Sequence, residues 1–78
     1  MNILIVGAGA QGAPCAAILA SQPSVRRILL GARKLAAAEA ARARIGSPKI
    51  VAAALDAAQP EKLVATVRAA LERVDVVI

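Results

Sequence analysis

Short apolar runs alternate along the chain with alanine-rich or amphipathic stretches. The apolar runs are rich in Val, Ile and Leu and predict four strands, over residues 2–6, 26–30, 49–55 and 74–78. The intervening stretches have helical propensity and spacing, and they predict helices over residues 11–21, residues 34–45 and a segment that opens with Pro60. The run 2–6 is continuous rather than alternating, which is typical of a strand buried on both faces.

This alternation predicts an α/β fold with a doubly wound parallel sheet, Rossmann-like, in which residues 1–78 form one domain. Short connections and right-handed crossovers give a strand order of 3-2-1-4 with three helices. The ligand crevice is then expected at the carboxyl ends of the strands, beside the first. Because residues 74–78 read as a strand without a cap, we expect the chain to be the front part of a longer protein and to be inactive alone.

Helical spacing also predicts which side chains of two helices face the sheet. For the third helix these are Leu63, Val67, Ala70, Leu71 and Val74. For the second helix they are Leu35, Ala38, Arg42 and Ile45, with the arginine stem lying along the core. The second strand is expected to end at Leu30, with a turn at Gly31 and Ala32.

The glycines after the first strand carry the strongest chemical signal. Gly7, Gly9 and Gly12 form G-x-G-x-x-G between a predicted strand and a predicted helix, which is the context of a dinucleotide-binding turn. The first glycine allows a sharp turn, the second lets a pyrophosphate approach the backbone, and the third allows close helix–strand packing. Ala10 and Gln11 complete the predicted cofactor-binding turn, although a purely structural glycine turn is the alternative.

The residues after the second strand favour NADP over NAD. An NAD-binding domain carries an acid about 20 residues beyond the glycines to bind the ribose hydroxyls. This chain has Ala32 there, followed by Arg33 and Lys34, and an arginine can bind a 2′-phosphate through two N–H donors. FAD and S-adenosylmethionine are disfavoured by the same missing acid, and NAD stays an alternative. For Arg33 and Lys34, the alternative interpretation is an exposed positive charge at the start of a helix.

Two further residues near this turn have two readings each. Asp56, at the end of the third strand, could approach the adenine, or it could cap the turn before the next helix. Cys15 lies in the first helix, and we interpret it as a small packing residue because there is no His to pair with it.

The composition of the chain argues against nucleic-acid binding, a membrane span and a metal site. The net charge is +5, but the cations are scattered and the aromatic content is 0%, so we expect no nucleic-acid binding. No apolar run approaches the roughly 20 residues of a membrane span, and we expect no membrane partner. A single cysteine and the absence of His give no metal site and suit a reducing, cytoplasmic compartment.

The run from Gly7 to Ala16, with the Ala-rich helix that it opens, resembles the N-terminus of the saccharopine dehydrogenase family. Arg33 matches the Arg of the acid–Arg pair in that family, with Ala32 in place of the acid, and residues 74–78 look like its fourth strand.

The resemblance implies an NAD(P)-dependent oxidoreductase that passes hydride between nicotinamide and an imine–amine pair. It also implies a following domain for a small-molecule substrate, and we expect a homo-oligomer in the full-length protein, with the catalytic residues unknown. A non-catalytic nucleotide-binding or redox-sensing module, and a Rossmann remnant that binds nothing, are the competing functions.

Overall fold

The computed structural model describes residues 1–7 and 12–78, and its strands and helices alternate as predicted. The strands are β1 (Asn2–Val6), β2 (Arg27–Ala32), β3 (Ile50–Ala54) and β4 (Val76–Val77). The helices are α1 (Gly12–Ala20), α2 (Leu35–Ile45) and α3 (Pro60–Ala70). No helix among the described residues is long and apolar enough to span a bilayer.

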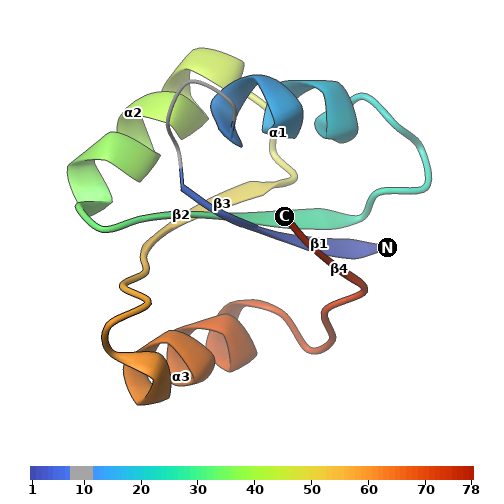
Figure 1. The fold of residues 1–78 in the computed structure, drawn as a ribbon. Helices are drawn as coiled ribbons and strands as arrows, with labels where there is room; N and C mark the ends of the chain where they lie inside the picture. Colours follow the sequence, from blue (N-terminus) through green and yellow to red (C-terminus); the bar gives the residue numbers. More distant parts are fainter. Residues whose placement is uncertain (8–11) are drawn as a thin grey trace.

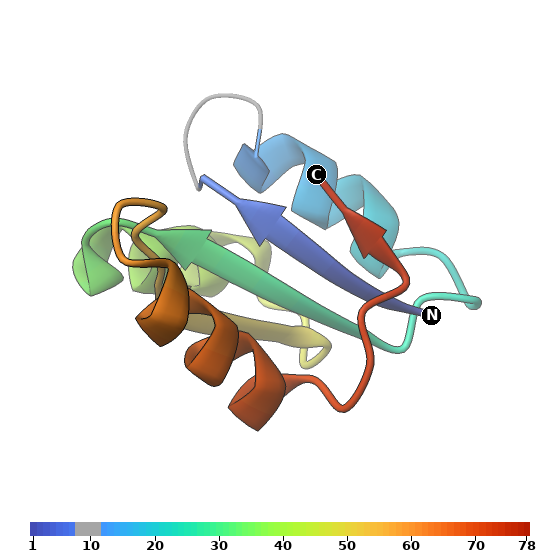
Figure 2. The ribbon, with the colours of Figure 1, turned by 60° about the horizontal axis from the view of Figure 1, so that its bottom comes forward.

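The sheet has the order β3-β2-β1-β4, and every neighbouring pair of strands is parallel. The predicted strand order is therefore confirmed. Helices α1 and α2 cover one face of the sheet, and α3 covers the other (Figure 1). Figure 2 shows β2, β1 and β4 side by side, with α3 in front of the β2 and β3 side of the sheet. This three-layer arrangement is the doubly wound, Rossmann-like α/β fold that the sequence predicts.

Each face of the sheet has its own apolar core, because successive side chains of a strand point to opposite faces. The core under α1 and α2 contains Ile3, Ile5, Val25, Ile28, Leu30 and Ile50, together with Ala16 and Ala41. The core under α3 contains Leu4, Leu29, Leu55, Val67 and Leu71. Small alanines let α1 and α2 lie close to the sheet, so a core without aromatic residues still fills the space.

Strand β2 is longer than the sequence pattern predicts. Gly31 is opposite Val6 of β1 and Ala53 of β3, and Ala32 is opposite Ala54. The prediction of a turn at Gly31 and Ala32 is therefore wrong. The ladder partners on both sides keep this segment extended, although glycine and alanine have a low intrinsic preference for strands.

The residues predicted to face the sheet are confirmed more fully for the third helix than for the second. The residues predicted to face the sheet from the third helix all reach the core, with Val67 and Leu71 buried and Leu63, Ala70 and Val74 packed against them. Helix α3 itself ends at Ala70, so Leu71 and Val74 do so from beyond the helix. In helix α2 the prediction is right for Ala38, which is buried, and for Ile45, which packs against the core, but wrong for Leu35 and Arg42. Leu35 is 49% exposed. Arg42 binds Glu39 at 2.8 Å instead of covering the core.

Candidate functional site

The segments of the predicted site meet at one edge of the sheet. β1, β2 and β3 are parallel, so the residues that follow them lie at the same edge, which is where doubly wound folds bind ligands. Gly7 follows β1, Arg33 follows β2, and Asp56 lies just beyond β3. The fold therefore gathers three segments that are far apart in the sequence.

Gly7 has the backbone conformation that the first glycine of the turn requires. Its φ is +108°, in the region that residues with a Cβ rarely adopt. Its N–H donates a hydrogen bond of 2.7 Å to the Gly31 carbonyl oxygen, which fastens the end of β1 to β2. The chain thus leaves the sheet at Gly7 in a conformation that favours glycine.

Gly12 packs against that same turn. A Cβ added to Gly12 would lie 1.7 Å from the Gly7 carbonyl oxygen and 3.5 Å from Cγ2 of Ile5. No side chain fits there, so the first described turn of α1 rests directly on the end of β1, as predicted for the third glycine. Gly9, Ala10 and Gln11 lie outside the described residues, and their contacts with a cofactor stay predictions.

A pocket of about 230 Å³ lies at the carboxyl ends of β2 and β3. Its lining residues come from the segments after these strands and from the start of α3, and they are Arg33, Ala54, Asp56, Gln59, Lys62 and Leu63. Pockets that hold whole small molecules are typically about 300–1,000 Å³. This pocket therefore suits one part of a dinucleotide rather than all of it.

The structure separates the cations that follow β2. Arg33 is exposed and lines the pocket, whereas Lys34 is not among the lining residues. Lys34 precedes α2 as its N-cap, with φ −105° and ψ 125°, and its carbonyl oxygen accepts a hydrogen bond from the Ala37 N–H. Ala32 ends β2 without a carboxylate, and its carbonyl oxygen accepts a hydrogen bond from the Leu55 N–H.

Asp56 stabilises the turn before α3 through two hydrogen bonds. Its Oδ1 accepts a hydrogen bond of 2.9 Å from the Ala58 N–H, and its carbonyl oxygen accepts one from the Gln59 N–H. These bonds shape the turn that leads into α3. The carboxylate also lines the pocket, so its contact with an adenine stays a prediction.

Two cations in this pocket have no partner in the described part of the chain. Neither Arg33 nor Lys62 forms an ion pair or a side-chain hydrogen bond there. The Asp56 carboxylate lines the same pocket but forms an ion pair with neither cation. Its oxygens therefore lie more than 4.0 Å from the charged nitrogens of Arg33 and Lys62. The charges of Arg33 and Lys62 are therefore available to an anionic ligand.

Gln59 and Lys62 were not predicted from the sequence as members of this site. Gln59 is the N-cap of α3, and the helix begins at Pro60, so Lys62 lies in its first turn. The predicted topology could have indicated them, since in a parallel sheet the helix after β3 begins at the carboxyl-terminal edge, where ligands bind. A cation in the first turn of a helix also works against the helix dipole.

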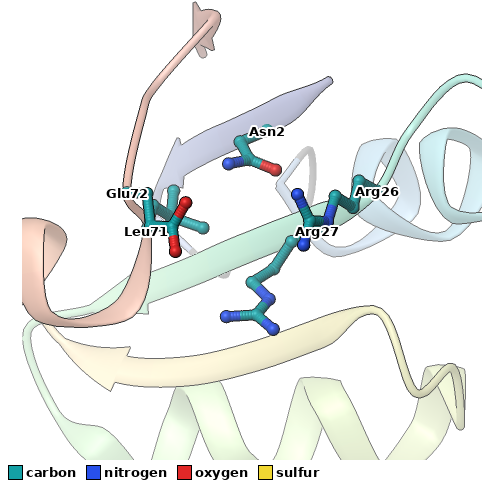
Figure 3. Close-up of a pocket in the computed structure, with 5 residues that line it drawn as sticks. All are labelled: Asn2, Arg26, Arg27, Leu71 and Glu72. Carbon is teal, nitrogen blue, oxygen red and sulfur yellow. The ribbon is translucent and has the colours of Figure 1, made fainter.

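The opposite edge of the sheet holds two neighbouring cavities. The smaller measures about 60 Å³ and is lined by Asn2, Arg26, Arg27, Leu71 and Glu72 (Figure 3). The larger measures about 320 Å³ and is lined by Met1, Asn2, Arg26, Glu72, Arg73 and Asp75. The Arg27 guanidinium donates a hydrogen bond of 3.2 Å to the Ala70 carbonyl oxygen and so fastens the end of α3 to β2. We interpret this edge as structural.

Asp75 connects β1 to the segment before β4 at this opposite edge. Its carboxylate accepts a hydrogen bond of 2.7 Å from the Asn2 N–H and forms an ion pair of 3.1 Å with Arg73. The Asn2 hydrogen bond, helped by the nearby Arg73 charge, lowers the pKa of the Asp75 carboxyl below its usual value. No local sequence pattern indicates this contact, because Asn2 is at the other end of the chain.

The remaining chemistry-bearing groups are few. Cys15 is partly buried and is a free thiol. Within residues 1–7 and 12–78 there is no cluster of three or more His, Cys, Asp or Glu side chains that could hold a metal ion. The site that the structure offers is thus a glycine turn beside a cationic pocket.

These features fit a phosphate-bearing dinucleotide. Gly7 supplies the positive φ at the end of β1, Gly12 leaves no side chain between α1 and the Gly7 carbonyl oxygen, and Arg33 offers a planar guanidinium at the end of β2. The family model described as the saccharopine dehydrogenase NADP binding domain matches residues 3–78 and so covers the described strands and helices apart from Asn2 of β1. Comparison with curated proteins gives no match.

Proposed function

The chain belongs to the saccharopine dehydrogenase NADP binding domain family, and from this premise we propose that it is the cofactor-binding part of an oxidoreductase acting on a carbon–nitrogen bond. The observation that carries the choice of cofactor is Arg33. It stands at the end of β2, lines the pocket there, and follows an alanine where an NAD-selective domain would place an acid.

The glycine turn would hold the pyrophosphate. Gly7 and Gly12 close the turn, and Gly9 would let the pyrophosphate reach the backbone N–H groups of the turn, at the N-terminal end of α1. Ala10 and Gln11 occupy the rest of the turn and would contribute backbone donors. The partial positive charge of the helix N-terminus would further stabilise the phosphates.

The adenosine end of NADP would lie at β2 and β3. Arg33 would bind the 2′-phosphate, with Lys34 adding a positive charge nearby, and the absence of a carboxylate at Ala32 removes the repulsion that such an acid would cause. Asp56 would accept a hydrogen bond from the adenine amino group at the other side of the pocket. These roles together predict a preference for NADPH over NADH.

When bound, NADPH supplies a hydride to the carbon of an imine, and a proton added to the nitrogen completes the amine. The described residues contribute binding and orientation of the cofactor. We propose that a further domain binds the small-molecule substrate and supplies the proton, that the full-length protein is a homo-oligomer, and that it is cytoplasmic.

Titration of the full-length protein with NADPH and with NADH, followed by calorimetry, tests the binding part of this proposal. NADPH should bind more tightly, and Gly9→Val should abolish binding of both nucleotides while the circular dichroism spectrum persists. Equal affinity of Gly9→Val and the parent protein for NADPH would overturn the assignment of the glycine turn.

Nicotinamide absorbance then tests the reaction. NADPH should be oxidised when an amino acid and a 2-oxo acid are supplied together as imine precursors, and not with either alone. Binding of NADPH without turnover on any amine–carbonyl pair would instead favour a non-catalytic nucleotide-binding or redox-sensing module.

A further inference from the structure

We propose that Lys62 of α3 is a second cationic ligand of the 2′-phosphate and determines cofactor specificity together with Arg33, an inference that rests on the proposed nucleotide site. Arg33 and Lys62 come from different elements, yet both line the pocket of about 230 Å³ at the carboxyl ends of β2 and β3. Lys62 would thus close the pocket from the α3 side.

The position of Lys62 in α3 is unfavourable for a cation without a ligand. The helix begins at Pro60, so Lys62 is its third residue, close to the partial positive charge of the N-terminus. The helix dipole destabilises a cation there, whereas it stabilises an anion at the same end. Residues that break a local rule without a compensating contact tend to lie at functional sites, and among the described residues Lys62 has no such contact.

The pocket has the charge that a phosphate monoester requires. A phosphate monoester carries about −1.5 to −2 charges at neutral pH, and the pocket offers the two cations, the exposed amide of Gln59 and the first turn of α3. One oxygen of the Asp56 carboxylate is engaged by the Ala58 N–H. Arg33 can bind two phosphate oxygens with its planar fork, and the lysine can add a point charge on a flexible stem.

The place of the pocket selects the 2′-phosphate rather than the pyrophosphate. The pyrophosphate belongs to the turn between β1 and α1, whereas this pocket lies beyond β2 and against the start of α3. Parallel sheets of this kind place the ribose of the adenosine at the end of the second strand. NADH lacks the 2′-phosphate and otherwise has the same groups, so it is the matched ligand for the test.

The test compares Lys62→Gln with the parent protein for binding of NADPH and NADH by calorimetry. Loss of a charge-assisted hydrogen bond should weaken NADPH binding about tenfold, with NADH affinity within about twofold of the parent. Lys62→Arg should keep NADPH affinity within about threefold, because it preserves the charge. Arg68→Gln is the control, since it removes one charge from the same helix outside this pocket.

Each other outcome has a definite meaning. If Lys62→Gln leaves NADPH affinity unchanged, or weakens NADPH and NADH equally, Lys62 is not a 2′-phosphate ligand although the proposed function stands. An equal NADPH-specific loss in Arg68→Gln would reduce the effect to overall charge and would also overturn the inference. If the parent protein binds neither nucleotide, the proposed function fails and the inference fails with it.

Discussion

The amino-terminal and carboxyl-terminal edges of the sheet use their charged groups differently. At the amino-terminal edge, Arg27 bonds to the Ala70 carbonyl oxygen, and Asp75 bonds to the Asn2 N–H and to Arg73. At the carboxyl-terminal edge, Arg33 and Lys62 share a pocket without an ion pair among the described residues. Arg27 and Asp75 therefore hold elements together, whereas Arg33 and Lys62 are available to a ligand. The contrast concerns these four residues, since Arg26 and Glu72 at the amino-terminal edge also form no ion pair among the described residues.

Gly12 and Gly46, one at each edge of the sheet, are required for different reasons. Gly12, at the carboxyl-terminal edge, has a backbone oxygen where a Cβ would be. Gly46, which caps the far end of α2 with φ +70°, has no atom within 4 Å of an added Cβ. Gly12 is therefore fixed by contact with the binding turn, and Gly46 only by its own backbone conformation.

The largest expected effect comes from Gly12→Ala. Its methyl group would overlap the Gly7 carbonyl oxygen, so α1 must move away from β1 and the turn must change shape. We expect a loss of about 3 kcal/mol in the free energy of unfolding, at the upper end of overpacking effects, and a loss of NADPH binding. Urea unfolding and calorimetry measure the two effects.

Gly46→Ala is the matched control for that experiment. Its cost should be about 1–2 kcal/mol from the left-handed conformation alone, and its NADPH affinity should equal that of the parent. If Gly46→Ala reduced NADPH affinity as much as Gly12→Ala, the separation of the two edges would be wrong.

A smaller effect, on cofactor preference alone, is expected from replacing Ala32 and Arg33 at the end of β2. Ala32→Asp combined with Arg33→Ala adds an acceptor for the ribose hydroxyls and removes a phosphate donor. A charge-assisted hydrogen bond contributes about 1.5–3 kcal/mol, so the ratio of NADPH to NADH affinity should shift toward NADH by about tenfold or more. Parallel titrations with both nucleotides measure this ratio, and a parent protein that already prefers NADH would contradict the assignment of Arg33.

The smallest effect is expected at the amino-terminal edge, from Asp75→Asn. Because the pKa of Asp75 is lowered in the folded state, its charge stabilises the fold above about pH 4, and this contribution is lost as the pH falls through the lowered pKa. The variant should melt slightly below the parent at pH 7, and the difference should shrink below about pH 4. NADPH affinity should not change. A variant that melts like the parent at pH 7 would remove Asp75 from the structural contacts of this edge.

The sequence by itself determined the elements, their order and the places of Gly7 and Gly12 at the first strand–helix connection. These features follow from local signals: apolar runs for strands, helical spacing on α3, Pro60 at a helix start, and glycines between a strand and a helix. The order 3-2-1-4 followed because parallel strands joined by short right-handed crossovers leave few arrangements. Arg33 was predicted as a site residue from its distance to the glycines, and the fold places it at the pocket.

Only the tertiary structure decided which residues meet across elements. Gly31 stays in β2 because Val6 and Ala53 flank it in the ladder and the Leu55 side chain covers it. In the same way, Lys62 joins Arg33 and Asp75 joins Asn2 through contacts between distant segments. Residue spacing encodes the periodicity of one element, but strand length, the buried face of a helix and shared pockets depend on the side chains that neighbouring elements bring, which local patterns do not specify.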